Sequence, residues 1–221
     1  MKRLTILITM LMAISVSAYN EIDLEQLQTL KDCNDCDLSN ARLIGNLSGA
    51  KLRNANLKGA NLEYANLSGA NIKNGNLEGA NLGRANLSGA NLGGANLKYA
   101  KLRKVNFSKA YLFNVDLSNN TLFGAILDGA DLRRANLSNT NLIVTHFKNA
   151  NLEGANLKGA NLENADLSGA NLEYANLEGV NLEYARLKNA KLSKANLKGA
   201  IFCTTQMPSG RWNNSGCKAD K

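Results

Sequence analysis

Residues 51–70 read KLRNA NLKGA NLEYA NLSGA, and this five-residue pattern decides the fold. From Leu47 to Phe202 an apolar residue recurs at every fifth position, in 32 consecutive units that share one register. A small residue, usually Ala, stands two positions before each apolar residue, and Asn or Asp usually stands directly before it. A period of five fits neither the turn of about 3.6 residues in an α-helix nor the two-residue alternation of a strand. The chain must therefore turn a corner every five residues.

Four such corners close a square coil of twenty residues, and successive coils stack at the ~4.8 Å that separates neighbouring strands. Leu and Ala should point inward in superposed columns, because a narrow core has no room for two large side chains on each side of a coil. Asn and Asp suit the corners, since their side chains bond to nearby backbone and tolerate turn geometry. The pattern predicts an all-β solenoid of about eight coils, roughly 40 Å long.

The repeat A-N/D-L-x-x resembles that of the pentapeptide repeat family over residues 38–202, and this resemblance implies a right-handed quadrilateral β-helix. Residues 33–38, CNDCDL, are similar to the C-x-x-C-D-L entry of many exported bacterial members. The tail from Thr205 to Cys217 is similar to their M-P-D-G and N-N-S-G-C endings, with Ser209 in place of the usual Asp.

Residues 1–18 have the features of a secretory signal peptide. Lys2 and Arg3 precede an apolar stretch that ends at Val16, and small residues stand before a cleavage site after Ala18. The stretch is shorter than the ~20 residues that a membrane span needs, so a cleaved signal is favoured over an anchor. We expect an exported bacterial protein, periplasmic or secreted, with no transmembrane segment after cleavage. Cleavage removes two positive charges and lowers the formal net charge from +8 to +6.

Four cysteines lie near the two ends of the mature chain, and none lies between them. An even number of cysteines in an exported protein indicates disulfide bonds. Four cysteines allow three connectivities, and the solenoid would hold the two pairs most of a rod's length apart. We therefore predict the bonds Cys33–Cys36 and Cys203–Cys217.

A solenoid needs a cap at each end, because its coils are stabilised by their neighbours. We expect residues 19–37 to contain a short capping helix and the first disulfide, with the cap contacts made by Ile22, Leu27 and Leu30. We expect residues 203–221 to form a C-terminal cap, in which Met207 and Trp212 lie over the last coil. One residue is missing from the register around Ile44 and Gly45, which predicts a distorted first coil.

Residue types that carry catalysis are scarce in this chain. Its one histidine, His146, excludes a His-based metal cluster, and the cysteines should lie far from it. His146 stands where the repeat usually has an outward Asn, so we interpret it as solvated. The Cys33-x-x-Cys36 spacing also occurs in thioredoxin-type redox pairs, but there it opens a helix after a strand, whereas here it would follow a helix. We expect a structural disulfide, no enzyme activity and no cofactor.

The repeat degenerates between residues 98 and 149, where basic, aromatic and apolar residues take outward positions. Exposed apolar patches bordered by charge often mark contact surfaces. The alternative is drift of the repeat with a local bulge, because inward positions such as Asn120 and Thr140 are irregular too. The predicted interaction patch comprises Arg84, Lys101, Arg103, Lys104, Phe113, Phe123, Ile126, Ile143 and Val144.

These observations favour a non-catalytic exported rod that binds a protein or an anionic envelope polymer through the patch. A purely structural envelope protein without a discrete site is the alternative. The resemblance also raises a further function, because gyrase-binding members of the family are thought to imitate DNA with a dimeric, acidic rod. The positive charge and the signal peptide oppose that function here, and we expect no specific nucleic-acid partner.

Overall fold

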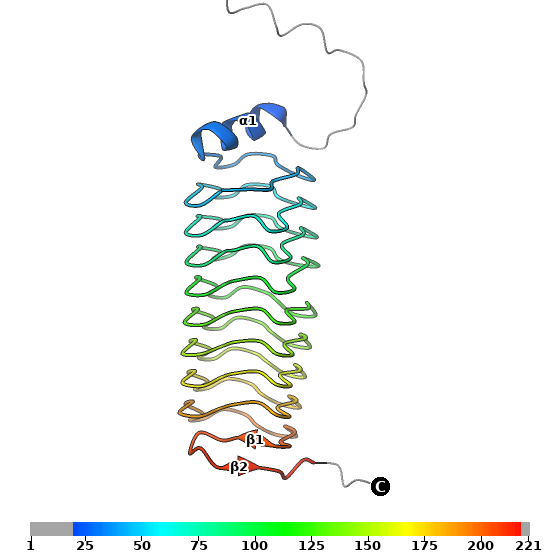
Figure 1. The fold of residues 1–221 in the computed structure, drawn as a ribbon, viewed down its shortest axis with the longest axis vertical. Helices are drawn as coiled ribbons and strands as arrows, with labels where there is room; N and C mark the ends of the chain where they lie inside the picture. Colours follow the sequence, from blue (N-terminus) through cyan, green and yellow to red (C-terminus); the bar gives the residue numbers. More distant parts are fainter. Residues whose placement is uncertain (1–19, 218–221) are drawn as a thin grey trace, which may run out of the picture.

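The computed structural model describes residues 20–217, and Figure 1 shows them as a rod of stacked coils. Helix α1, Glu21–Leu30, lies across one end of the rod. Strands β1, Thr205–Gln206, and β2, Trp212–Asn213, form a hairpin at the other end. The expected signal peptide, residues 1–18, lies outside the described residues.

Between α1 and β1, each five-residue unit forms one side of a coil and ends in a turn. Parallel bridges join almost every side to the same side of the next coil, and from Asn46 onward the partners lie twenty residues apart, as in the pair Asn46 and Asn66. Backbone hydrogen bonds accompany the bridges: the Leu62 N–H donates to the Asn81 carbonyl at 2.8 Å. The twenty-residue period predicted from the sequence is confirmed by these contacts.

Two columns of inward side chains on each side fill the core. The central Leu of almost every unit and the Ala two positions before it are fully buried. Phe107 and Phe147, which replace Leu, are the largest fully buried side chains. Because the second column is nearly all Ala, the coil is narrow and one large side chain per unit fills it.

The irregular inward residues of the middle coils keep their place in the core, so no bulge turns the register. Thr140 Oγ1 donates to the Leu117 carbonyl at 3.0 Å, and Thr145 Oγ1 donates to the Leu122 carbonyl at 3.2 Å. Their hydroxyl groups are therefore satisfied although buried. The inward residues that depart from Ala are Val105, Val115, Asn120, Thr140 and Thr145, all buried.

The second residue after each central residue adopts the left-handed conformation. Its φ is 58° at Asn54, 67° at Gly59 and 60° at Tyr64. Residues with a Cβ atom adopt this conformation at a cost, which Gly avoids and Asn partly offsets. This backbone requirement explains why Gly and Asn dominate the position.

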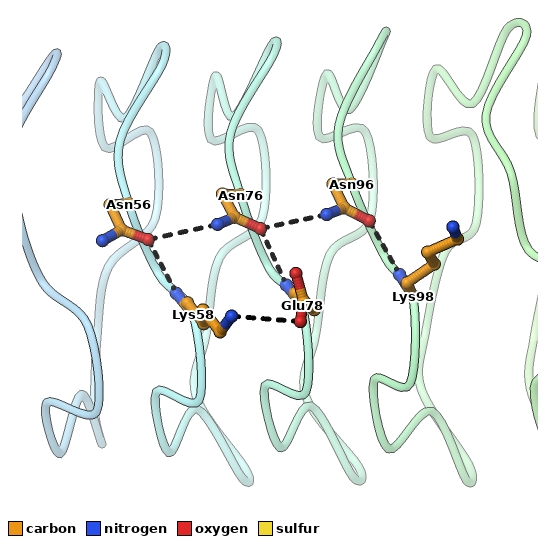
Figure 2. A network of polar contacts seen from close by, with 6 residues as sticks. All are labelled: Asn56, Lys58, Asn76, Glu78, Asn96 and Lys98. Atoms are coloured by element: carbon orange, nitrogen blue, oxygen red, sulfur yellow. Dashed lines mark hydrogen bonds and ion pairs between the residues drawn. The ribbon is translucent and has the colours of Figure 1, made fainter.

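In several columns of the rod, the Asn that precedes the central residue joins its turn to the neighbouring coil (Figure 2). Asn76 Nδ2 donates to Asn56 Oδ1 at 3.3 Å, and Asn96 Nδ2 donates to Asn76 Oδ1 at 3.2 Å. Asn76 Oδ1 also accepts the backbone N–H of Glu78 at 3.2 Å. Lys58 Nζ lies 3.1 Å from Glu78 Oε1 on the same side of the rod. In these columns one amide per unit thus stabilises its own turn and bonds two coils together.

Helix α1 contacts the first coil through a single face. Leu27 is fully buried and Leu24 is partly buried against the core, whereas Ile22 and Leu30 are 73% and 72% exposed. The expectation that Ile22 and Leu30 cover the first coil is therefore wrong. Ile22 precedes Leu27 by five residues, which places it about 140° away around the helix axis. Leu30 is the last residue of the helix.

The hairpin at the C-terminal end covers the last coil through β1. Met207 packs against the core as expected, and buried Thr205 Oγ1 donates to the Leu182 carbonyl at 2.7 Å. The expected position of Trp212 over the last coil is wrong, because its side chain is 59% exposed. Antiparallel pairing with Gln206 holds Trp212 in β2, the outermost strand of the rod (Figure 1).

The disulfide bonds join Cys33 to Cys36 and Cys203 to Cys217, which is the connectivity expected from the sequence. Disulfide bonds form and persist mainly outside the reducing cytoplasm, so they indicate a non-cytoplasmic environment. Within residues 20–217, no helix has the length and apolar character that a membrane crossing requires.

The first coil is one residue shorter than the others. Asp32 and Lys51 form a bridge across only nineteen residues, whereas twenty separate Asn46 from Asn66. Gly45 lies between the two registers with a φ of 118°, a conformation that a residue with a Cβ atom rarely adopts. Gly45 thereby absorbs the missing residue, as the sequence predicts.

Candidate functional site

Most of the predicted interaction patch gathers on one side of the rod. This side is formed by one unit from each of four successive coils, the units that begin at Asn81, Lys101, Thr121 and Asn141. Backbone bonds connect these units at the outward turns: the Arg84 N–H donates to the Arg103 carbonyl at 3.0 Å. We call the group on this side the contact face. It consists of Arg84, Lys101, Arg103, Lys104, Phe123, Ile143 and Val144.

Two residues of the predicted patch lie on other sides of the rod, so the prediction of one nine-residue patch is wrong for them. Ile126 is on the adjacent side, where it forms a bridge with His146. Phe113 precedes Phe123 by ten residues, which is half a coil, and therefore lies on the opposite side. There the Arg133 guanidinium carbon is 5.8 Å from its ring centroid. The two residues were included in the predicted patch because they are near the others along the chain, but the square coil places them on different sides.

The centre of the contact face is a cation–π pair. The Arg103 guanidinium carbon lies 4.9 Å from the centroid of the Phe123 ring, one coil away. The Lys104 N–H donates to the Phe123 carbonyl at 3.0 Å and ties the two turns together. Such a pair contributes about 0.5–1 kcal/mol at an exposed site. The ring is half-buried, so part of its surface remains open to a partner.

The basic half of the contact face has no carboxylate partner. Within residues 20–217, Lys101, Arg103 and Lys104 form no ion pair, although basic side chains elsewhere do, as Lys158 does with Glu178 at 3.2 Å. Arg84 instead stacks on the Tyr64 ring and donates to its hydroxyl. Unpaired positive charges on one side of a rod attract anionic groups.

The apolar half of the contact face contains Phe123, Ile143 and Val144 on two neighbouring coils. The Gly124 N–H donates to the Ile143 carbonyl at 3.0 Å, which fixes the two turns next to each other. Val144 is exposed and has a φ of 57°, a conformation that is an outlier for a β-branched residue. The repeat requires this conformation at the same position of every unit, so the cost at Val144 comes from the residue type and not from an unusual backbone. The sequence identified Val144 as apolar, but only the backbone shows the strain.

A groove beside the contact face was not predicted from the sequence. Its volume is about 580 Å³, and its walls include Arg103, Tyr99 and Thr121. Gly83 occupies the outward position one coil before Arg103 and leaves a hollow there. A second groove of about 350 Å³ lies beside Gly93 on the opposite side. Glycine occupies this outward position at only these two units. The two glycines are therefore the feature of the sequence from which the grooves could have been predicted.

The opposite side carries an ion pair that makes stability depend on pH. Arg133 Nε and Nη2 donate to the two carboxylate oxygens of Asp131 at 2.8 and 2.7 Å. These bonds lower the pKa of Asp131 below its ordinary value, although burial acts in the opposite direction. A group with a lowered pKa adds stability above its unfolded value, about 3.9 for Asp. That stability is lost as the pH falls through the folded pKa.

We therefore expect Asp131→Asn to remove part of the acid sensitivity of the rod. As the pH falls below about 4, the free energy of unfolding of the natural chain should fall more steeply than that of the variant. The difference should stay below about 1 kcal/mol because the pair is partly exposed. Urea unfolding at pH 6, 4 and 2.5 measures it. Parallel pH profiles for the two proteins would contradict the assignment.

Comparison with protein families matches pentapeptide repeats in 8 copies, over residues 46–79, 80–119, 121–145, 145–183 and 170–205. HetL, a pentapeptide repeat protein involved in heterocyst differentiation regulation in the cyanobacterium Nostoc sp. strain PCC 7120, has a similar solved structure. It is 37% identical and the match covers 82% of this chain and 85% of HetL, with a TM-score of 0.35.

Two other solved structures are similar over parts of the chain. A pentapeptide repeat protein from the thylakoid lumen of Arabidopsis thaliana is 33% identical, over 46% of this chain and 64% of its own, with a TM-score of 0.31. QnrB1, a plasmid-mediated fluoroquinolone resistance protein, is 21% identical, over 74% of this chain and 85% of its own, with a TM-score of 0.39. No curated protein matches the chain.

The family matches extend over most of the chain and coincide with the stacked coils. The chain belongs to the pentapeptide repeat family, whose members fold as a right-handed quadrilateral β-helix.

Proposed function

We propose that the chain is a non-catalytic exported rod that binds a protein or an anionic envelope polymer through the contact face. Arg103 stacked on Phe123 is the observation that carries the proposal. Pentapeptide repeat proteins generally serve as structural or interaction proteins, and the two disulfide bonds support a location outside the cytoplasm.

The contact face combines two kinds of attraction on one side of the rod. Lys101, Arg103 and Lys104 offer unpaired positive charge, and the next two coils offer Phe123 and Ile143. An interface gains most of its binding energy from a few aromatic and arginine residues in a desolvated centre. A partner that places an acidic group over Arg103 and apolar groups over the next two coils would satisfy both halves.

The rest of the rod supports a structural role as the second candidate. On the side shown in Figure 2, charged residues pair with each other between coils, as Lys58 does with Glu78, and the amide ladder fills the column beside them. Lys158 and Glu178 repeat this arrangement further along. Such a side leaves little unpaired charge for a partner.

Substitution of the apolar half of the contact face tests the proposal. Phe123→Ser combined with Ile143→Ser should weaken capture of the partner at least tenfold, because the aromatic anchor and its apolar neighbour are lost together. The measurement is retention from envelope extract and culture medium on immobilised mature chain with both disulfides intact. Capture should also weaken as salt rises, since the basic half is exposed.

Phe113→Ser is the matched control. It removes an outward aromatic side chain stacked with an arginine, as at Phe123, but on the opposite side of the rod. It should retain the partner as the natural chain does. Equal retention by the double variant and the natural chain would overturn the contact face and leave the structural role.

A further inference from the structure

One stretch of the rod lacks several of the backbone hydrogen bonds that join neighbouring coils elsewhere. Between residues 94–102 and residues 113–121, Asn96 still forms a parallel bridge with Asp116, but Lys101 and Thr121 form none with each other. The equivalent contacts one coil earlier are present, as from the Leu82 N–H to the Lys101 carbonyl at 2.9 Å. We call this stretch the open joint. Within residues 20–217, the N–H groups of Gly94, Tyr99, Leu102 and Thr121 form no backbone bond across it.

Asp116 interrupts the amide ladder at the open joint. In the preceding coils an Asn amide donates to the Asn below it, but the Asp116 carboxylate has no N–H to donate to Asn96. Asp116 accepts from Asn136 Nδ2 at 3.0 Å, so its contacts are made toward the following coil. Asn96 Oδ1 already accepts the Lys98 N–H, and Asn96 Nδ2 donates toward Asn76. The side chains of Asn96 and Asp116 therefore form no hydrogen bond with each other across the open joint.

Asn120 places a buried amide inside the open joint. It occupies an inward position that Ala fills in most coils, and it is only 5% exposed. Its Nδ2 donates to the Leu97 carbonyl at 3.2 Å, and within residues 20–217 its Oδ1 accepts no hydrogen bond. Ala95 and Ala100 are 5% and 6% exposed here, whereas Ala80 in the preceding coil is fully buried. Solvent therefore reaches the inner column at this level.

The groove of about 580 Å³ coincides with the open joint. Asn120 and Thr121 form one wall, Tyr99 lies at the corner, and Lys101 and Arg103 lie at the rim. Its surface thus combines a buried amide, an aromatic ring, two cations, and the backbone N–H groups of Tyr99, Leu102 and Thr121, which form no backbone bond across the joint within residues 20–217. Glu63 is the one carboxylate in the lining.

We propose that this groove binds a saccharide that carries a carboxylate group. A hydroxyl donates one hydrogen bond and accepts two, so a polyhydroxylated ring matches walls that mix unpaired donors and acceptors. The carboxylate would pair with Arg103 and Lys101, which hold no other anion. An extended peptide fits less well, because the unpaired backbone groups face each other along the rod axis and form no free strand edge.

This inference deepens the proposed function and rests on it, since Lys101 and Arg103 belong to the contact face. It identifies the partner chemistry at the basic half as an acidic glycan. The apolar half is not needed for a disaccharide to occupy the groove. The two proposals can therefore fail separately.

Hydrogen exchange and calorimetry on the mature, disulfide-bonded chain test the saccharide site. In the free protein, the amides of Tyr99 and Leu102 should exchange at least tenfold faster than that of Leu77, whose bond to the Asn96 carbonyl is 2.8 Å. Digalacturonate should slow exchange across the open joint and bind at least tenfold more tightly than cellobiose, a neutral disaccharide. Binding of neither saccharide overturns the site, and equal binding of both overturns the role of the carboxylate.

Asn120→Ala should weaken digalacturonate binding at least tenfold, because it removes the buried amide from the groove. Thr140→Ala is the matched control: it removes an inward side chain that also bonds a carbonyl of the preceding coil, outside the groove. It should bind as the natural chain does. Unchanged affinity of Asn120→Ala would overturn the site.

Ile143→Ser separates the two proposals, because Ile143 belongs to the apolar half of the contact face and does not line the groove. It should bind digalacturonate within twofold of the natural chain while it weakens capture of the macromolecular partner. If it weakens that capture and digalacturonate does not bind the natural chain, the contact face stands and the saccharide site falls. A loss of digalacturonate binding in Ile143→Ser would place the saccharide on the contact face and overturn the groove.

Discussion

Phe147→Ala should lower the free energy of unfolding by about 4 kcal/mol. The Phe147 side chain is fully buried and stacks in a column with Leu127 and Leu167 of the adjacent coils. Replacing it with Ala removes the transfer free energy of the ring and leaves a cavity between two rungs. The coils above and below cannot close over that cavity, because their backbone bonds fix the distance between them.

The loss should also be local in its consequences. Each coil of a solenoid contacts only its neighbours, so a defect weakens the two interfaces around it. Urea unfolding followed by circular dichroism measures the total loss, and hydrogen exchange locates it. Protection should fall most for the amides of Leu127 and Leu167 and least for those near the ends. A uniform fall along the rod would contradict nearest-neighbour stacking.

Phe113→Ala serves as the control for this substitution. It deletes the same ring from an outward position that is 43% exposed, so it should cost less than about 1 kcal/mol. Similar losses for Phe113 and Phe147 would mean that burial does not decide the cost. A loss below about 1 kcal/mol for Phe147 would contradict the packing of the core.

The columns of the rod could be predicted from the sequence because the period fixes them. Five residues per side and four sides per coil place every residue above the one twenty positions earlier. The pair Lys58 and Glu78 and the neighbourhood of Arg103 and Phe123 follow from that arithmetic. The inward orientation of Thr140 follows too, although the residue type is unusual there.

Features that do not repeat could not be predicted in the same way. Ile22 and Trp212 lie in the end segments, where a helix rotation and a hairpin register decide exposure. The open joint depends on hydrogen bonds that are missing between two specific coils. Asp116 fits the repeat template, and the irregular Asn120 does not by itself indicate that those bonds are missing. Phe113 is a different case. The twenty-residue period already places it on the side opposite Phe123, because the two residues are half a coil apart, so its exclusion from the contact face was predictable from the sequence.

The double variant Cys203→Ala, Cys217→Ala should lower the stability of the C-terminal end by about 3 kcal/mol. The disulfide closes a loop with a sequence separation of 14 and so restricts the unfolded ensemble of the tail. The last coil needs this restriction, because Leu197 and Phe202 are only partly buried. Hydrogen exchange of residues 185–217 measures the effect directly.

The part of the rod in which hydrogen-exchange protection is lost shows whether the disulfide stabilises only the C-terminal end or the whole solenoid. Few backbone bonds hold the tail to the last coil, among them the Gly216 N–H to the Phe202 carbonyl at 2.6 Å. Without the disulfide, the tail and the last coil should exchange faster, while the Leu132 amide in the middle of the rod keeps its protection. Faster exchange at Leu132 would show that the end nucleates the whole solenoid. Unchanged exchange in the tail would show that the β1–β2 hairpin alone is sufficient to hold the end.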